Sequence, residues 1–569
     1  MERSSGDDAF SRLTRPGKGR FSKIFQRRFF TGRLLLLILL MLSPGCSEEE
    51  DQAKVHSSGP VLRIGTTMVI KQANPVADYY YNILAMVMTH DSLVRFDEDL
   101  KPVPQLAERF SSDREGRVWT FDLDPGARWH DGRPVTPGDV KFTFEYLARH
   151  HLSSGWAGHM IEAIETRGHR VVFRLKEPHS RFLINAGFVV RILPGHIWRN
   201  ISDPHKTENR AVSVGCGPFM LEDFDPAART VSFRVNRDYY GPLPTIGRVS
   251  FQTYGTTDLL ALALIKEQVD LYYQYAAGMP VPYVKKLAAQ PHLACMWAES
   301  MGIPAVLGFN LSSSLVEALA VRRAVALAVD YSQLSACLMN GESRIPTPGL
   351  VPPSLSAPAD LSPWKQNPDE SRALLASMGW RDRDGDGVLE TAQGVPAVPT
   401  LLVRSDLWGE SQVVKLLARD LRKIGLKLRV RSADLSTYLA FLKEGDYDLV
   451  LFRTTPWGMM MHAGLGTGYF DGEKTQSLNL CRLKDEAFFA LCHEILKTTD
   501  PDRLKTLYTK VQRYYAEHLP AVALCWGRSY FPFNKKWQGF SINQLEGGLA
   551  NRFSWQNLAP SPSKGVEAR

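Results

Sequence analysis

Residues 90–147 read HDSLVRFDEDLKPVPQLAERFSSDREGRVWTFDLDPGARWHDGRPVTPGDVKFTFEYL, and this stretch decides the fold class. Within it, RVWTFDL (residues 117–123) alternates apolar and polar side chains, which predicts a half-buried strand. A helix is expected to begin after Thr136, because Thr is a good N-cap, Pro137 suits the first turn and Asp139 lies near the positive helix end. A strand followed by a capped helix indicates mixed α/β structure.

The same alternation of strands and helices continues on both sides of this stretch. Short β-rich runs predict strands at residues 61–70, 229–236, 426–433 and 447–453. Amphipathic periodicity predicts helices at residues 83–93, 314–330, 369–380, 411–425 and 501–519. Strands that alternate with helices favour α/β lobes, and 569 residues leave room for more than one such lobe.

The positive charge of the chain is concentrated at its N-terminus. The formal net charge is +8, but residues 1–46 hold nine Lys and Arg against three acidic residues, which leaves +2 for the rest. That remainder gives no reason to expect nucleic-acid binding. The basic block leads into the apolar residues 34–42, which are too few to span a bilayer as a helix. This arrangement predicts a secretory signal over residues 1–46.

The apolar run ends in LSPGC, residues 42–46, which resembles a bacterial lipoprotein box. We therefore expect Cys46 to be acylated and to anchor the protein at the extracytoplasmic face of the cell membrane; an ordinary cleaved signal is the alternative. The polar residues 47–59 are expected to form a flexible tether, and residues 561–569 a frayed tail. Exported proteins can form disulfides, so Cys481 and Cys492 either form one or remain buried thiols.

The opening stretch resembles the signature of bacterial extracellular solute-binding proteins of family 5, the receptors of ABC importers for peptides and metal chelates. Ordered matches continue over roughly residues 60–545, among them VGCGPFML, NRDYYGPLPTIGRVSF, EQVDLYY and NPDESRALLASMGWRDRDGDGVLE. The resemblance implies a periplasmic-binding-protein-like α/β fold of type II, with two main lobes, a hinge cleft and an extra inserted lobe. Lobe I would comprise residues 60–92, 211–308 and 516–560, the inserted lobe 93–210, and lobe II 309–515.

The function implied by the resemblance is ligand capture. The protein would bind an oligopeptide in the cleft as a monomer and deliver it to the ABC permease and its ATPase; a nickel or other metal chelate is the alternative ligand. A hydrolase using His130 and Asp131 is the rival from another class. The sequence contains no nucleophile elbow, HExxH helix or P-loop, so we expect neither enzymatic activity nor a cofactor.

The segment after residue 446 distinguishes the two ligand classes. Peptide-binding relatives carry an Asp here that pairs with the peptide's α-ammonium, but in this chain no Asp follows Asp448 until Asp471. The run RTTPWG instead resembles the nickel-chelate branch. The resemblance therefore implies ligand contacts from the following four residues: Arg453, Trp457, Met461 and His462.

Further ligand contacts are implied by the resemblance at six positions of the first two lobes. Tyr79 and Tyr80 lie where the family's first helix faces the cleft, and Trp156 matches a Trp of the nickel branch. Glycines let a ligand approach the main chain, so the turn SVGCGPF suggests contacts from Gly215, Cys216 and Gly217. A tight hinge turn is an equally good explanation of these glycines.

A cluster of carboxylates in residues 382–387 is a weak candidate for a metal site. Asp382, Asp384 and Asp386 reproduce the first half of a calcium loop, but Gln393 occupies the place of its bidentate Glu. The same sequence is a frequent turn, so we expect no bound metal.

Overall fold

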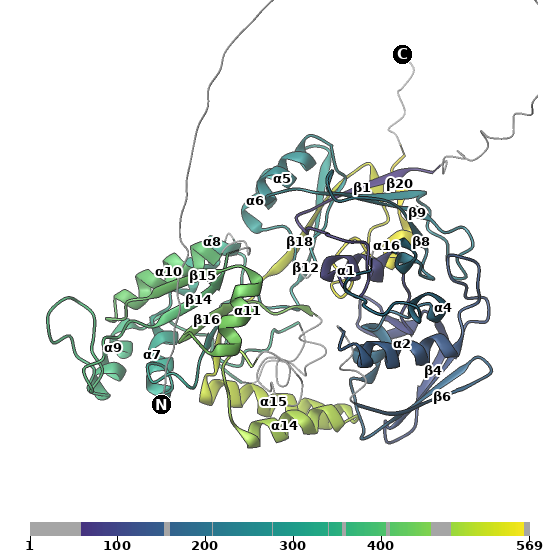
Figure 1. The fold of residues 1–569 in the computed structure, drawn as a ribbon. Helices are drawn as coiled ribbons and strands as arrows, with labels where there is room; N and C mark the ends of the chain where they lie inside the picture. Colours follow the sequence, from purple (N-terminus) through teal and green to yellow (C-terminus); the bar gives the residue numbers. More distant parts are fainter. Residues whose placement is uncertain are drawn as a thin grey trace, which may run out of the picture. The chain divides into compact units, whose positions relative to one another are not determined.

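The computed structural model describes residues 59–152, 160–207, 209–275, 277–339, 341–354, 360–405, 410–456 and 479–562. Three sheets of four or more strands organise these residues, with helices packed on their faces (Figure 1). Strands from distant parts of the sequence pair in two of the sheets, so neither sheet corresponds to one continuous segment of the chain.

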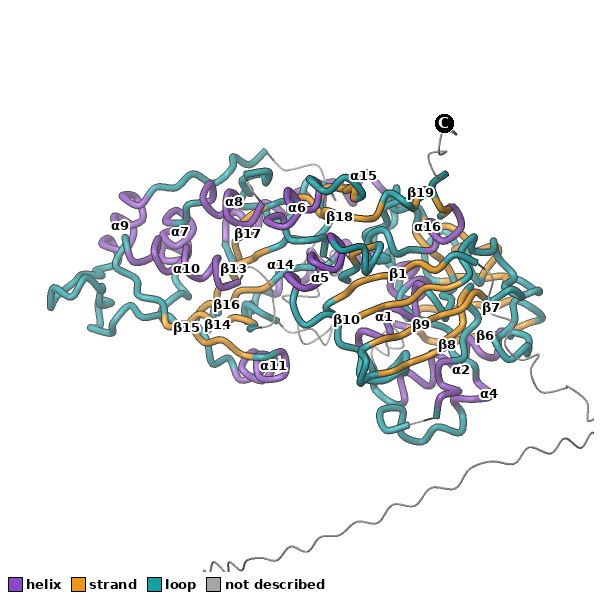
Figure 2. Tube along the Cα trace, turned by 90° about the horizontal axis from the view of Figure 1, so that it is seen from above, coloured by secondary structure: helices purple, strands orange, loops and turns teal. Residues whose placement is uncertain are grey.

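The largest sheet has seven strands and is seen from above in Figure 2. Its central strands β1, β10 and β11 are parallel, and β9, β8, β18 and β12 extend it in antiparallel pairings. In spatial order the strands are β12 (Leu293–Glu299), β18 (Arg528–Asn534), β11 (Leu271–Tyr272), β1 (Val61–Thr66), β10 (Arg248–Thr253), β9 (Thr230–Val235) and β8 (Phe219–Asp225). Three helices accompany this sheet: α1 (Tyr79–Val87), α5 (Thr257–Ile265) and α6 (Val281–Ala288).

The second sheet has five strands. Strands β15, β14 and β16 are parallel, whereas β13 is antiparallel to both β16 and β17. Their order is β15 (Arg429–Ala433), β14 (Thr400–Arg404), β16 (Leu449–Phe452), β13 (Ala305–Phe309) and β17 (Ala521–Cys525). The helices of this part are α7 (Leu319–Ala328), α8 (Tyr331–Met339), α9 (Pro368–Ser377), α10 (Glu410–Arg422), α11 (Leu435–Glu444), α14 (Glu486–Lys497) and α15 (Pro501–His518).

The third sheet is antiparallel and lies within residues 107–175. Its order is β4 (Ala107–Ser112), β5 (Val118–Leu123), β7 (Arg170–Leu175) and β6 (Ile161–Arg167). The described helical segments of this region are α2 (Pro137–Arg149), a π-helical turn η1 (Leu183–Phe188), α4 (Gly195–Trp198) and a 3₁₀ turn η2 (Arg210–Ser213). Short strand pairs β2 (Val94–Phe96) with β3 (Pro102–Pro104) and β19 (Trp537–Gln538) with β20 (Ala559–Pro560), and the helix α16 (Arg552–Asn557), make up the remainder.

The strand and helix expected in the opening stretch are confirmed. Strand β5 buries every second residue, and α2 begins after Thr136 with a capping box, in which Thr136 and Asp139 each bond the other's backbone N–H. The helix expected at residues 83–93 is shifted: it starts at Tyr79, because Asp78 caps it by accepting a hydrogen bond from the N–H of Tyr81.

One hydrophobic core unites the seven-stranded and four-stranded sheets. Leu62 and Phe251 of the first belong to the same buried cluster as Phe121 and Phe173 of the other. The five-stranded sheet has separate clusters, which involve α7, α8 and α10 in one case and α11, α14 and α15 in the other. The region predicted as an inserted lobe therefore shares the core of the predicted lobe I.

Two segments carry the chain between the seven-stranded and five-stranded sheets. Residues 300–304 link β12 to β13, and residues 526–527 link β17 to β18. The two segments lie side by side, since the N–H of Ser300 donates to the carbonyl of Gly527 at 2.9 Å. Strands β13 and β17 belong to the five-stranded sheet, although the expected division placed β17 and all of β13 except Phe309 in lobe I. The strand pairing sets the boundary at these two crossovers.

Candidate ligand-binding site

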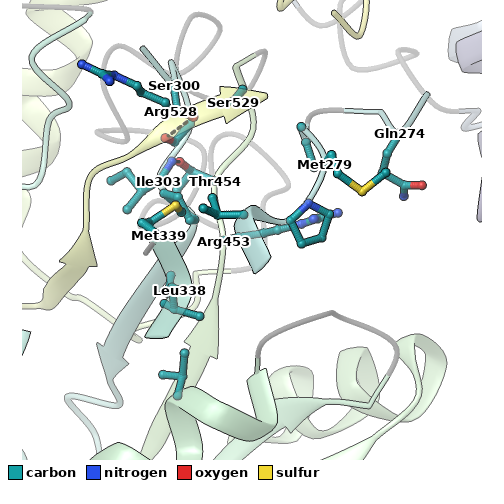
Figure 3. A pocket seen from close by; sticks show the side chains of 18 of the residues that line it. Gln274, Met279, Ser300, Ile303, Leu338, Met339, Arg453, Thr454, Arg528 and Ser529 are labelled. Carbon is teal, nitrogen blue, oxygen red and sulfur yellow. Dashed lines mark hydrogen bonds between the residues drawn. The ribbon is translucent and has the colours of Figure 1, made fainter. Parts of the chain in front are cut away.

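A pocket lies where the two crossovers meet the ends of both large sheets. Thr67, Tyr272 and Gln274 line it from the seven-stranded sheet, and Phe452 and Thr454 line it from the five-stranded sheet. Further lining comes from the crossover 300–304 and from the helices α6, α8 and α10 (Figure 3), through Ser300, Gly302, Val281, Leu338, Met339 and Val413.

The pocket is formed at the carboxyl ends of parallel strands. Thr67 follows β1, Gln274 follows β11 and Arg453 follows β16, so each side chain is delivered by a buried strand that ends at the pocket. Thr257 and Val281, the first residues of α5 and α6, also line it. Ligands bind at this edge of open α/β sheets because strands end and helices begin there.

Arg453 and Arg528 are the charged residues among the described lining of the pocket. Arg528 has its own partners: its Nε lies 3.2 Å from a carboxylate oxygen of Glu299, and its guanidinium is 4.0 Å from the ring centroid of Trp297. Arg453 takes part in none of the ion pairs formed among the described residues. Its charge opposes the effect of burial, which raises the pKa of Tyr272. The described lining therefore presents one positive charge to a ligand.

Close main-chain contacts shape the walls of the pocket. A Cβ on Gly302 would lie 2.5 Å from the carbonyl oxygen of Thr454, and one on Gly278 would lie 2.3 Å from the nitrogen of Tyr530. Neither backbone has room to move for a side chain, so only glycine fits at these two positions. The N–H of Ile303 also donates to Thr454 Oγ1 at 2.7 Å, which holds a crossover against the end of β16.

The predicted tyrosines lie beside the pocket. Tyr79, at the first position of α1, is 60% exposed, and its ring lies 6.3 Å from that of Tyr275 and 5.4 Å from that of Tyr80. Tyr275 follows Gln274, which lines the pocket. A ligand that extends beyond the pocket toward α1 would meet Tyr79; neither Tyr79 nor Tyr80 is among the lining residues themselves.

The predicted glycine turn packs against the protein's own backbone. A Cβ on Gly215 would lie 1.8 Å from the carbonyl oxygen of Thr89, and the N–H of Gly217 donates to that carbonyl at 2.8 Å. Cys216 is fully buried between them, and burial raises the pKa of its thiol. These residues bind the end of α1 rather than lining the pocket, and their contact with a ligand stays a prediction.

Several predicted site residues lie outside the described part of the chain. They are Cys46, Trp156, Trp457, Met461 and His462. Of the predicted contacts within the described part, Arg453 lines the pocket.

His130 and Asp131 do not form a catalytic pair. The Nε2 of His130 lies 3.0 Å from the carbonyl oxygen of Gly217, and its Nδ1 accepts from the N–H of Gly215 at 3.2 Å. Asp131 instead faces His196, whose Nε2 lies 2.6 Å from its carboxylate. Both ring nitrogens of His130 are therefore engaged by the glycine turn, which is a structural role.

The three carboxylates of the acidic turn bond their own backbone. Oxygens of Asp382, Asp384 and Asp386 lie within 4.8 Å of one another, and all three side chains are exposed. Asp382 accepts from the N–H groups of Gly385 and Gly387 at 2.7 and 2.9 Å. These bonds are those of a turn. No disulfide joins the six cysteines of the described residues, so Cys481 and Cys492 are buried thiols.

The sequence reasoning missed most of the residues that line the pocket. Thr67, Gln274, Ser300, Met279 and Met339 were not among the expected contacts, although they line it. Thr67 could have been found, because it lies in the β-rich run 61–70, whereas no predicted strand marked the position of Gln274. The others reach the pocket through the crossovers and helix ends, which carry no local signal.

The architecture defines a class: two α/β parts joined by paired crossovers, with a pocket at the strand ends of both, as in periplasmic binding proteins. Residues 101–476 match the family model described as bacterial extracellular solute-binding proteins, family 5 Middle. The chain belongs to this family of non-catalytic substrate-binding proteins, which function in ABC import. The hydrolase alternative is therefore excluded.

Relatives of known name are distant but cover nearly the whole chain. The oligopeptide-binding protein AppA of Bacillus subtilis is 21% identical over 526 residues, 90% of this chain and 95% of the relative. The nickel-binding periplasmic protein of Escherichia coli is 22% identical over 470 residues, 80% and 87% respectively. Peptide-binding and metal-binding proteins are thus both found among its relatives.

Solved structures show the same fold. AppA of B. subtilis in complex with a nonapeptide has a TM-score of 0.74 at 20% identity, covering 88% of this chain and 99% of that one. NikZ of Campylobacter jejuni in complex with Ni(L-His) has a TM-score of 0.75 at 20% identity, covering 88% and 99%. The α/β periplasmic-binding-protein fold expected from the sequence is thereby confirmed.

Among the described residues, no helix is both long enough and apolar enough to cross a bilayer.

Proposed function

We propose that this protein captures an oligopeptide in the pocket between its two α/β parts and delivers it to a membrane permease. The observation that carries the proposal is the position of the pocket, lined by strand ends of both large sheets, by the crossover 300–304 and by the start of β18. A ligand held there touches both parts at once, so it favours the conformation in which they are closed together. Closure would then signal occupancy to the permease.

Arg453 would hold the ligand's negatively charged group. Among described lining residues it is the cation without an ion-pair partner, and a guanidinium binds a carboxylate through two parallel hydrogen bonds. A peptide supplies such a group at its C-terminus or on an acidic side chain. The apolar residues Met279, Leu338 and Met339 supply a surface for an apolar side chain.

A chelated metal is the second candidate, and the same arginine favours it. The described lining offers no His, Cys or carboxylate side chain as a direct ligand, so a metal would have to arrive within a chelator. NikA of Brucella suis, solved in complex with Fe(III)-EDTA, shares the fold with a TM-score of 0.75. Carboxylates of a chelator would pair with Arg453 as those of a peptide would.

Native mass spectrometry of gently purified protein separates the two candidates. A bound mass that releases peptides on denaturation supports the peptide proposal, whereas a co-purified metal without peptide overturns it in favour of a chelate. A pocket that retains neither after incubation with a mixture of tri- to nonapeptides, or with Ni²⁺ and free histidine, would contradict both.

Arg453→Gln tests the role of the arginine. We expect retention of the co-purified ligand to fall at least about tenfold, because a charge-assisted bidentate contact is lost. Arg453→Lys keeps the positive charge but not the bidentate geometry of the guanidinium, so this variant should retain part of the ligand binding. Both variants should unfold at the same urea concentration as the unchanged protein; equal ligand retention in all three would show that Arg453 does not contact the ligand.

Lipid anchoring at Cys46 belongs to this proposal as well. The family acts outside the cytoplasm, and a tethered receptor would remain close to its permease.

A further inference from the structure

A second contact joins the two α/β parts, away from the crossovers and the pocket. It involves the segment 177–181, which follows β7, and the ends of α14 and α15 that face it. Ser180 makes its central hydrogen bonds: its N–H donates to the carbonyl of Leu496 at 2.6 Å and its Oγ to the carbonyl of Ile495 at 3.0 Å. These carbonyls belong to the last turn of α14, where the helix leaves acceptors incompletely bonded.

Contacts on both sides extend this junction. Lys497, the last residue of α14, forms an ion pair with Glu177. Arg181 donates a hydrogen bond to the hydroxyl of Tyr508 on α15, and its guanidinium lies 5.8 Å from the centroid of that ring. A carboxylate, two hydroxyls and two cations are thus matched across the contact.

The chain topology shows that this contact can open. Segment 177–181 belongs to the part whose core contains the seven-stranded and four-stranded sheets, whereas α14 and α15 pack on the five-stranded sheet. Two crossovers connect these parts covalently: residues 300–304 run from β12 to β13, and residues 526–527 run from β17 to β18. Figure 1 shows α14 and α15 extending toward the region of β4 and β6, while the crossovers lie near β12 and β18. Rotation about the crossovers would separate Ser180 from α14. The apolar packing shared by the two parts, through Val281 of α6 and Tyr530 of β18, belongs to the cluster of α7, α8 and α10 and not to the cluster of α14 and α15.

The energetics of Arg181 favour a contact that is easily broken. Its Nε is buried without a hydrogen-bond partner among the described residues, and burial lowers the pKa of its guanidinium. Arg552, in contrast, is buried against the carboxylate of Asp91. Burying a cation without a carboxylate costs solvation free energy that a single hydroxyl does not fully offset. Opening returns Arg181 to water, which limits the net stability of the closed contact.

We propose that segment 177–181 and the facing ends of α14 and α15 form a closure latch that sets the balance between open and closed states independently of the ligand. The latch residues do not line the pocket. A ligand that binds the closed state has its apparent affinity reduced by the fraction of molecules that are open. Changes in the latch would therefore tune affinity and release without altering any ligand contact.

A matched pair of substitutions at Ser180 tests the latch. Ser180→Glu places a negative charge against the negative end of α14, whereas Ser180→Gln has the same size without the charge. Amide hydrogen exchange of the full chain, without ligand, would be followed by mass spectrometry in peptides covering residues 177–181 and 495–499. We expect protection of both segments to fall about two- to fivefold more in the Glu variant than in the Gln variant, after correction for intrinsic rates.

The two segments belong to different parts of the molecule, so a coupled change distinguishes opening from fraying of one loop. Equal protection in both variants, or a change confined to residues 177–181, would overturn the proposal. Charge reversal is the second test: Lys497→Glu should lower protection of both segments, and adding Glu177→Lys should restore it. Failure of the double variant to recover, with the melting transition unchanged, would also overturn the latch. Neither result depends on the identity of the ligand, so the proposed function is tested separately.

Discussion

The Nη1 of Arg552 lies 2.7 Å from Oδ1 of Asp91, and both side chains are buried. Arg552 also donates to the carbonyls of Met86 and His90 at 3.0 Å, and the hydroxyl of Tyr240 donates to Asp91 at 2.5 Å. The pair thereby joins α16, near the end of the described chain, to the loop after α1 that begins the fold-deciding stretch. Segments more than 450 residues apart are fastened at this point.

Removing one member of this pair should destabilise the protein strongly. Arg552→Met leaves the carboxylate of Asp91 buried without its cation, so the free energy of unfolding should fall by about 3–5 kcal/mol. Urea denaturation followed by circular dichroism measures this. Arg174→Met, which breaks an exposed ion pair with Glu165, is the control and should change little. Similar urea midpoints for the two variants would show that the buried ion pair contributes no more to stability than the exposed one.

Stability should decrease as the pH falls below about 6.5, and His90 should contribute to the decrease. Burial lowers the pKa of this fully buried imidazole to about 3 from its ordinary value of 6.5. Between these pH values the unfolded chain binds a proton that the folded chain does not. Each pH unit of acidification in this range therefore lowers the free energy of unfolding by about 1.4 kcal/mol through this residue. The stability that depends on a neutral His90 is fully present above pH 6.5 and is lost progressively as the pH falls toward 3.

The measurement is the free energy of unfolding between pH 5 and 7. His90→Asn should reduce its slope by about 1.4 kcal/mol per pH unit in the lower half of this range. His205→Asn, a change at an exposed loop position, is the control and should leave the slope unaltered. Identical slopes for all three proteins would mean that His90 titrates normally in the folded state.

Gly215→Ala should destabilise the fold through a clash with backbone. The added Cβ would lie 1.8 Å from the carbonyl oxygen of Thr89, and that oxygen is held by the N–H of Gly217. We expect a loss of about 1–3 kcal/mol or more in the free energy of unfolding. Gly255→Ala, whose Cβ would have no neighbour closer than 3.9 Å, is the matched control. Equal stability of the two variants would contradict the close approach at Gly215.

Cys46→Ser should release the protein from the membrane fraction of cells. The substitution removes the thiol that acylation requires, whereas Cys337→Ser alters an exposed cysteine of α8 and should leave the distribution unchanged. Fractionation followed by immunoblotting gives the result. Retention of the Cys46→Ser protein in the membrane fraction would exclude acylation at this position as the anchor.

Local patterns predicted individual elements well where the chain itself supplies the boundary. Thr136 and Asp139 form the capping box of α2 within a few residues of sequence, so the start of this helix can be read directly. The helix α1 begins four residues before its predicted start, because its cap is the carboxylate of Asp78, which also accepts from the N–H of Lys71. This cap is as local as that of α2, since Asp78 bonds the N–H of Tyr81 three residues on, but the apolar periodicity used for the prediction begins only at Ile83.

Arg453 shows what sequence comparison could contribute to the site. The resemblance of the run RTTPWG to the nickel-chelate branch predicted a ligand contact there, and Arg453 lines the pocket. At Gly215 and Gly217 the contact with a ligand stays a prediction: glycine permits close approach to any main chain, and here it approaches that of Met88 and Thr89, just after α1. Composition and spacing do not distinguish a ligand's backbone from the protein's own.

The sequence by itself determined the α/β class and the family, and it concentrates most of the formal positive charge in residues 1–46. These properties rest on local periodicity, short caps and ordered motifs, which act over a few residues. The tertiary structure decided where the parts divide and which residues meet in the pocket. Strands β13 and β17 join the five-stranded sheet through hydrogen bonds between segments more than 200 residues apart. Only the folded chain specifies such pairings, because the free energy of a strand depends on the neighbours that cover it.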